Sequence, residues 1–183
     1  MKNLNVYLQE NTCINEKLVI THYKPYSCAP QTKKELKEII KERLEKDPTA
    51  DLNDIDVRNI TDMSYLFCYL NPHNIDISEW DVSNVENMKF MFTTCENFNS
   101  DLSRWDVSNV KDTYAMFNGC KKFNSDINGW NVYNVEDMRY MFNACTQFDS
   151  DLNNWDVSNV RYMSSIFNGC DSMKELPEWY VEQ

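Results

Sequence analysis

The hexapeptide WDVSNV occupies residues 80–85, and it returns unchanged at residues 105–110 and 155–160. A close variant, WNVYNV, occupies residues 130–135, and a more divergent copy, IDVRNI, occupies residues 55–60. The step between successive copies is 25 residues each time. Self-similarity at a fixed period of this size is typical of repeat proteins, in which stacked copies bury one continuous core. The sequence therefore predicts five stacked repeats, the first of them degenerate.

Two kinds of apolar spacing alternate within one repeat. From Val85 to Cys95, apolar side chains stand three, six, seven and ten residues after the first, a spacing that predicts a short helix with one apolar face. Asn84 precedes this run at the place of a helix N-cap. From Phe98 to Leu102, apolar and polar residues alternate as in a strand. We therefore expect an α/β solenoid, in which each repeat adds one short helix and one short strand, with strands paired in parallel about 4.8 Å apart.

The chain divides into three predicted segments. Residues 1–50 form an N-terminal segment, in which Thr32 and Glu35 make a capping box at the start of a helix over about residues 32–47. Residues 51–175 form the repeat array, and residues 176–183 form a short C-terminal cap. Within residues 1–30, two alternating stretches suggest a hairpin.

The repeat W-D-V-S-N-V-x-x-M-x-x-M-F-x-x-C-x-x-F-N-S-D-L closely resembles the DUF285 repeat of BspA-like leucine-rich-repeat proteins, across all four well-preserved copies. The resemblance implies a right-handed leucine-rich-repeat-like solenoid. It also implies a bacterial protein, because members are described mostly as bacterial surface proteins or lipoproteins, with adhesion or binding of host proteins proposed for some. Those members carry a signal or a lipobox, and this sequence shows neither. We therefore expect a cytoplasmic protein, with a cell-surface or secreted location as the alternative.

The charge of the chain restricts its partners. The formal net charge is -11, and residues 51–175 hold 20 acidic and 9 basic side chains. Nucleic acids and anionic membrane surfaces attract Lys and Arg, so neither is expected as a partner. No stretch approaches the roughly 18 apolar residues of a membrane span. A basic protein partner fits this charge, although acidity also serves solubility alone.

The cysteines form a column, by which we mean residues that recur every 25 positions. The column contains Cys95, Cys120, Cys145 and Cys170, and Leu70 takes its place in the first repeat. A Leu at this position indicates buried, reduced thiols. The absence of a CxxC pair and of paired histidines argues against zinc. A Cys13–Cys28 disulfide is plausible only outside the cytoplasm.

Four further columns are best explained by structure. Asp residues at the repeat start, and those that follow Trp80, Trp105 and Trp155, are expected to cap turns, because the three glycines of the chain are too few for the Gly-rich turns of calcium solenoids. A column of Asn residues is expected to satisfy backbone donors at the turns. The Trp column is expected to lie in the core, because Ile55 replaces Trp in the first repeat. The Asn and Trp columns comprise Asn59, Asn84, Asn109, Asn134 and Asn159, and Trp80, Trp105, Trp130 and Trp155.

Catalytic chemistry finds no support in the sequence. The two histidines are His22 and His73, and no Ser-His-Asp set, phosphate-binding loop or metal cluster can be assembled around them. We therefore expect no enzyme activity and no cofactor. The expected function is a scaffold for protein–protein interaction, and the alternative is a surface adhesin of the BspA type.

Function in a stack of repeats lies in outward-facing columns that vary from copy to copy. On the expected strand face, the candidate partner-binding residues are Asp76, Ser78, Glu79, Asp101, Ser103, Arg104, Asp126, Asn128, Asp151 and Asn153. On the expected helix side, Tyr65, Phe90 and Tyr140 share a column, and Tyr114 lies beside it. These aromatic residues are either exposed interface anchors or packing between neighbouring repeats.

Overall fold

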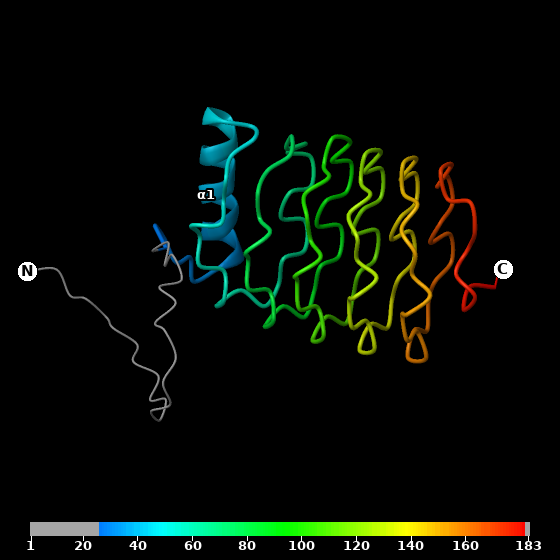
Figure 1. The fold of residues 1–183 in the computed structure, drawn as a ribbon. Coiled ribbons are helices and arrows are strands. Elements are labelled where there is room, and N and C mark those ends of the chain that lie inside the picture. The colour runs from blue at the N-terminus through cyan, green and yellow to red at the C-terminus, as the bar shows by residue number, and fades with distance from the viewer. Residues whose placement is uncertain (1–25, 182–183) are drawn as a thin grey trace, which may run out of the picture.

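Successive repeats lie side by side as irregular coils, with one helix at the N-terminal end of the row (Figure 1). The computed structural model describes residues 26–181, so the expected hairpin and Cys13 lie outside the described residues. Neighbouring coils are joined in register by isolated parallel bridges. These bridges are Cys28–Ile55, Asp51–Asp76, Asp62–Asn87, Asn87–Asp112, Asp112–Asp137 and Asp137–Tyr162.

Helix α1, Lys33–Lys46, covers the first coil. Its N-cap is Thr32, whose hydroxyl accepts the N–H of Glu35 at 3.2 Å, so the predicted N-cap is confirmed. The return bond of the predicted capping box differs, because the Glu35 carboxylate accepts the N–H of Gln31, one residue before the N-cap, at 2.8 Å. Leu36 and Ile40 are fully buried on one face of α1. This apolar face closes the core at this end of the row.

The expected α/β solenoid is wrong for this chain. Within residues 26–181, α1 is the only helix, and the bridges between coils extend into neither a strand nor a sheet. The predicted helix after Asn84 is a series of turns, because Phe90 (φ 56°) and Thr94 (φ 62°) adopt the left-handed conformation. Around Thr94, the N–H of Cys95 donates to the carbonyl of Phe92 three residues earlier, as in a turn.

The predicted strand is also absent, because side chains replace the backbone ladder there. The Ser100 hydroxyl donates to the carbonyl of Ile75 in the preceding coil. The N–H of Leu102 donates to the Ser125 hydroxyl at 3.0 Å. Strand pairing needs backbone groups to bond to each other, and here Ser side chains stand between them.

Stacked aromatic rings fill the core. The indoles of Trp80 and Trp105 lie 6.4 Å apart with an interplanar angle of 4°, and the rings of Phe92 and Phe117 lie 5.5 Å apart at 2°. Each indole N–H donates to a carbonyl of the preceding coil, as from Trp105 to Ile77 at 3.0 Å. The Trp column therefore lies in the core, as the sequence predicts.

The row ends in a partial coil. Trp179 stands one residue ahead of the 25-residue register, yet its ring stacks on Trp155 at 6.4 Å, and its indole N–H donates to Leu152 at 2.8 Å. Tyr180 contacts Phe167 edge to face, with ring centroids 5.3 Å apart. These two rings cover the last coil on one side only, and both remain half-buried.

Candidate functional site

The residues predicted to bind a partner recur at matching positions in adjacent coils. The opening Asp of each repeat is exposed, and its Oδ1 accepts the N–H two residues on: Asp101 from Ser103 at 2.9 Å, and Asp151 from Asn153 at 2.9 Å. The prediction that these Asp residues cap turns is therefore confirmed. We call this surface the acidic face; its members are Asp76, Ser78, Glu79, Asp101, Ser103, Arg104, Asp126, Asn128, Asp151 and Asn153.

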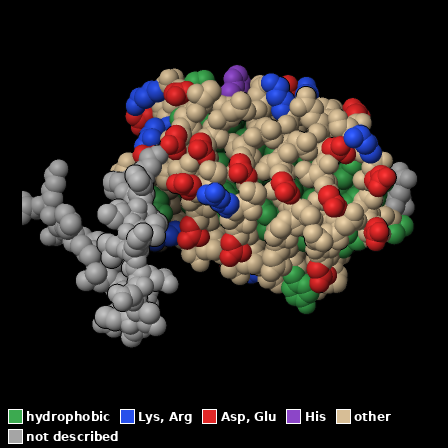
Figure 2. Space-filling view, in the orientation of Figure 1, with side chains coloured by type: hydrophobic (Ala, Val, Ile, Leu, Met, Phe, Trp, Pro, Cys, Tyr) green, Lys and Arg blue, Asp and Glu red, His purple; other side chains and the backbone are tan. Residues whose placement is uncertain are grey.

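A second row of carboxylates runs beside the first, directly after Trp80, Trp105 and Trp155, and Asn131 takes this place after Trp130. Asp81 and Asp106 accept the N–H groups of Ser83 and Ser108 at 3.1 and 3.0 Å, and they are exposed. Figure 2 shows one side of the row of coils, where acidic side chains spread along its length with few basic ones between them. The two rows therefore hold their negative charge at a repeating interval on a fixed backbone.

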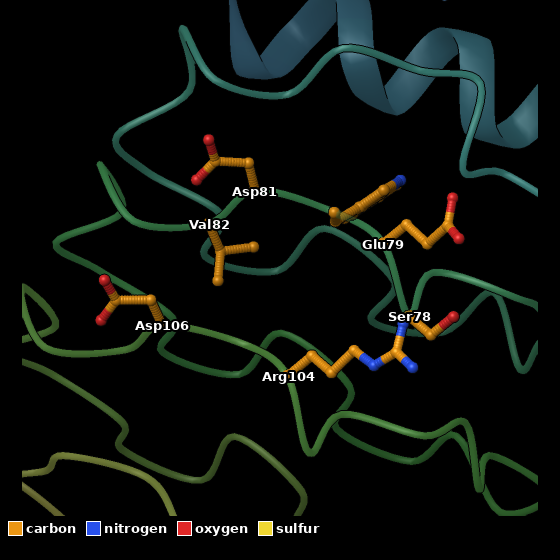
Figure 3. A pocket seen from close by; sticks show the side chains of 7 residues that line it. Ser78, Glu79, Asp81, Val82, Arg104 and Asp106 are labelled. Atoms are coloured by element: carbon orange, nitrogen blue, oxygen red, sulfur yellow. The ribbon is translucent and has the colours of Figure 1, made fainter. Parts of the chain in front are cut away.

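A shallow hollow of about 450 Å³ lies between the two rows. Figure 3 shows the Arg104 guanidinium reaching toward Ser78, with the carboxylates of Asp81 and Asp106 on the other side of the hollow. Glu79 also lines it. A single guanidinium among three carboxylates leaves this hollow with a net negative charge.

Hydrogen bonds from the turns favour the ionised form of Asp101 and Asp106. The backbone N–H of Ser103, followed by its hydroxyl, lowers the pKa of Asp101. The Ser108 hydroxyl has the same effect on the pKa of Asp106. Both donors favour the charged form, so the acidic face is negative at neutral pH.

The aromatic residues on another side of the coils form a continuous strip. The Tyr65 ring stacks on Phe90 at 4.7 Å, Phe90 meets Tyr114 at 4.9 Å, and Tyr114 meets Tyr140 at 5.8 Å. Tyr65 is 44% exposed and Tyr140 36%. The rings therefore pack against neighbouring coils and face solvent at once, so both expectations hold together. We call Tyr65, Phe90, Tyr114, Tyr140 and Tyr162 the aromatic strip.

Sequence reasoning missed two cations in this strip. The Lys89 ammonium lies 5.0 Å from the centre of the Tyr114 ring. The Arg139 guanidinium lies 5.1 Å from Tyr114 and 4.9 Å from Tyr162. A cation over a ring face is stabilised by the ring quadrupole. The available signal was position, since Lys89 and Arg139 directly precede Phe90 and Tyr140 in the sequence.

The cysteine column has no accessible chemistry. Cys95, Cys120 and Cys145 are fully buried free thiols, which confirms the sequence prediction. The Cys120 thiol donates to the carbonyl of Phe92 at 3.0 Å. Burial raises the pKa of Cys95 to about 12. Thiolate is the reactive form, so these thiols are inert at neutral pH.

The Asn column satisfies acceptors and not donors, contrary to expectation. The Asn109 side-chain amide donates to the carbonyl of Ser83 in the preceding coil at 2.7 Å, and Asn134 donates to Ser108 at 2.7 Å. The Asn84 and Asn159 amides make the same bond. This column joins adjacent coils where no backbone donor reaches the carbonyl.

Across residues 26–181, no group of three or more His, Cys, Asp or Glu side chains is placed to hold a metal ion. No helix in this part of the chain is long and apolar enough to cross a membrane.

One family model matches most of the chain. It is described as "Mycoplasma protein of unknown function, DUF285", and it matches residues 34–139 and again residues 105–183. No curated protein and no solved structure matches the chain. Together the two overlapping matches cover residues 34–183, so the chain belongs to the DUF285 family of Mycoplasma proteins of unknown function.

Proposed function

We propose that the chain is a non-catalytic scaffold that binds a basic polypeptide through the acidic face. The observation that carries this proposal is that the two oxygens of one Asp carboxylate differ in their hydrogen bonding. In Asp126 and Asp151, Oδ1 accepts the turn N–H, while Oδ2 accepts no hydrogen bond from any described residue. These repeats therefore each offer solvent one carboxylate oxygen whose position is held by the turn.

A basic segment suits such a surface for two reasons. The carboxylates recur once per coil, so successive Lys or Arg side chains of an extended segment can each meet one. The negative field of the array also attracts a cationic partner before contact, which raises the association rate. Because the coils are tied by backbone and indole hydrogen bonds, binding requires little reorganisation of the scaffold.

The test separates charge from folding. Asn in place of Asp keeps the Oδ1 acceptor, and Asn131 already caps Tyr133 in this way at 3.2 Å. The first variant carries Asn at Asp101, Asp126 and Asp151. The control variant removes the same number of charges elsewhere, with Gln at Glu86, Glu96 and Glu136.

The measurement is affinity capture from cell lysate at physiological salt, followed by titration of the purified partner. We expect the Asn variant to lose the partner and the Gln variant to retain it. Equal loss of the partner in both variants would show that binding depends on the net charge of the chain and not on the acidic face. Full retention in both would remove the acidic face from consideration.

The aromatic strip is a second candidate surface for the same scaffold function. Tyr162 is 55% exposed beside Arg139, and exposed aromatic side chains next to Arg are frequent anchors of interfaces. In the same capture experiment, a Tyr140→Ser, Tyr162→Ser variant that loses the partner while the Asn variant keeps it would favour the strip.

A further inference from the structure

Backbone hydrogen bonds between coils run in one direction along part of each repeat. In the coil of residues 126–150, four alternate residues donate their N–H groups forward to carbonyls of the next coil. The four bonds are Met138 to Tyr162 at 2.8 Å, Tyr140 to Ser164 at 3.1 Å, Phe142 to Ile166 at 3.0 Å, and Ala144 to Asn168 at 2.7 Å. The coil of residues 101–125 makes the same four bonds from Thr113, Ala115, Phe117 and Gly119.

The last coil carries the same donors without the same acceptors. The counterparts of those residues are Met163, Ser165, Phe167 and Gly169, and no described residue accepts their N–H groups. Ser165 and Gly169 keep the left-handed conformation of the inner coils, with φ of 57° and 76°. The geometry that directs N–H groups forward is therefore retained at the end of the row. We call these four residues the open edge.

The open edge differs from the edge of a β-sheet. An edge strand presents N–H and C=O groups together, whereas these four positions present donors alone. Two open edges facing each other would place donors against donors. A ligand for this edge must supply a row of acceptors.

A second copy of the chain cannot supply that row from its other end. The residues of the first coil that match these acceptors are Asp62, Ser64, Leu66 and Cys68, and α1 lies against this end of the row (Figure 1). The Lys37 ammonium of α1 donates to the carbonyl of Tyr65, between Ser64 and Leu66, at 2.6 Å. Lys33 donates to the side chains of Asp62 and Ser64 in the same region, at 2.6 and 2.9 Å. Head-to-tail stacking of copies, which would give open filaments, is therefore blocked.

We propose that the open edge docks an extended segment of a different protein, which adds to the row as one further layer. The segment supplies backbone carbonyls at alternate residues, as residues 162–168 do for the coil before them. The half-buried rings of Trp179 and Tyr180 provide an apolar contact, because the outer face of Trp179 occupies the position that the next indole covers in earlier coils. Exposed Asp171 and Glu175 favour a segment with basic flanks.

Amide hydrogen exchange on the whole chain tests this proposal. The probe is a synthetic peptide of residues 131–150 of this chain, with two Lys residues added at each end, because it carries the acceptor carbonyls in the required order. The control peptide has the same composition in scrambled order. In the free protein, we expect the amides of the open edge to exchange on the order of 100-fold faster than those of Met138, Tyr140, Phe142 and Ala144.

The peptide should slow exchange at the open edge by about tenfold or more at saturation, while the scrambled peptide leaves it unchanged. Slow exchange without peptide at every protein concentration would overturn the proposal, because the edge would then be covered by its own chain. Amide exchange at the open edge that slows as the protein concentration rises would show that a second copy of the chain binds there, which would also overturn the proposal. No protection at millimolar peptide would show that the edge docks no extended segment.

One variant links the effect to the donors themselves. Met163→Pro removes one edge N–H at a residue outside the left-handed set, and the peptide should bind it at least about fivefold more weakly. The variant with Asn at Asp101, Asp126 and Asp151 should bind the peptide normally, which keeps this inference separate from the acidic face. Thermal unfolding verifies that both variants fold, and the exchange experiment on the unmodified chain decides the matter if Met163→Pro does not.

Discussion

Left-handed residues offer the sharpest test of the backbone of the coils. Ala144 has φ of 58° and Gly119 has φ of 77°, at equivalent positions in successive repeats. The left-handed conformation costs a non-glycine residue roughly 1–2 kcal/mol of unfolding free energy. Replacing Ala by Gly lowers the unfolding free energy by about 0.4–1 kcal/mol, because Gly gives the unfolded chain more conformational entropy. Ala144→Gly should therefore stabilise the protein by about 0.5–1 kcal/mol, and Gly119→Ala should destabilise it by a similar amount.

Steric contact does not confuse this comparison. A Cβ added to Gly119 would meet its nearest neighbour, the Thr94 Cα, at 3.6 Å, an ordinary van der Waals distance. The control is Ala50→Gly, because Ala50 is buried and is outside the left-handed set. The same substitution there should destabilise the protein by about 1 kcal/mol.

The assay is urea unfolding followed by Trp fluorescence and circular dichroism, with the slope of each transition compared among variants. Each kcal/mol should shift the melting temperature by roughly 2–4 °C in a chain of this size. If Ala144→Gly destabilises the protein as much as Ala50→Gly does, residue 144 does not adopt the left-handed conformation. If Gly119→Ala leaves the free energy of unfolding unchanged, residue 119 does not adopt the left-handed conformation.

Four further predictions concern the turns and the core. Asp106→Ala should cost about 1 kcal/mol of unfolding free energy, because the Ser108 N–H loses its acceptor, whereas Asp106→Asn should be nearly neutral at pH 7 in urea titrations. The pKa of Asp106 is lowered, so its stabilising contribution is present above its ordinary value of 3.8 and is lost as the pH falls through the lower folded-state value; acid titration of Asp106→Asn should lack this component. Cys120 should resist aromatic disulfide reagents in the folded protein at pH 8 and react fully in urea, and labelling at the rate of an exposed thiol would contradict its burial. Trp130→Phe should destabilise the protein by about 2 kcal/mol, because the Leu102 carbonyl loses its indole donor, and a change below about 0.5 kcal/mol would show that this bond contributes little.

Side-chain patterns carried most of the information that the sequence held. The burial of Trp80 and Cys95 and the turn role of Asp101 follow from residue type and a constant step of 25 residues. These predictions depend on which side chains face inward. They hold for any backbone that repeats at that interval.

The path of the backbone was not accessible in the same way. Apolar residues three apart suit one face of a helix, but they also suit successive turns closed by bonds from residue i to i−3, as from Met91 to Met88 and from Val85 to Val82. Left-handed turns usually show themselves through Gly or Asn. Phe90 and Tyr140 adopt that conformation as aromatic residues, so the sequence carried no signal there, whereas Gly119 and Gly169 did mark the second left-handed position.

The candidate surfaces divide along the same line. The acidic face could be predicted because its charged residues recur every 25 positions in the sequence. The open edge could not, because it depends on the direction in which backbone N–H groups point, and that direction is set by the left-handed turns.

The register of Trp179 shows which changes in chain length this architecture accepts. Inside the row, indoles stack at a step of 25 residues, as Trp80 does on Trp105 and Trp130 on Trp155, so the gain or loss of one residue would misplace every contact that follows. Loss or duplication of 25 residues would leave each remaining layer with equivalent neighbours. Trp179 arrives one residue early and still stacks on Trp155, because no later described indole depends on its position. Length variation among related chains should therefore come in whole repeats within the row and in single residues at its last layer.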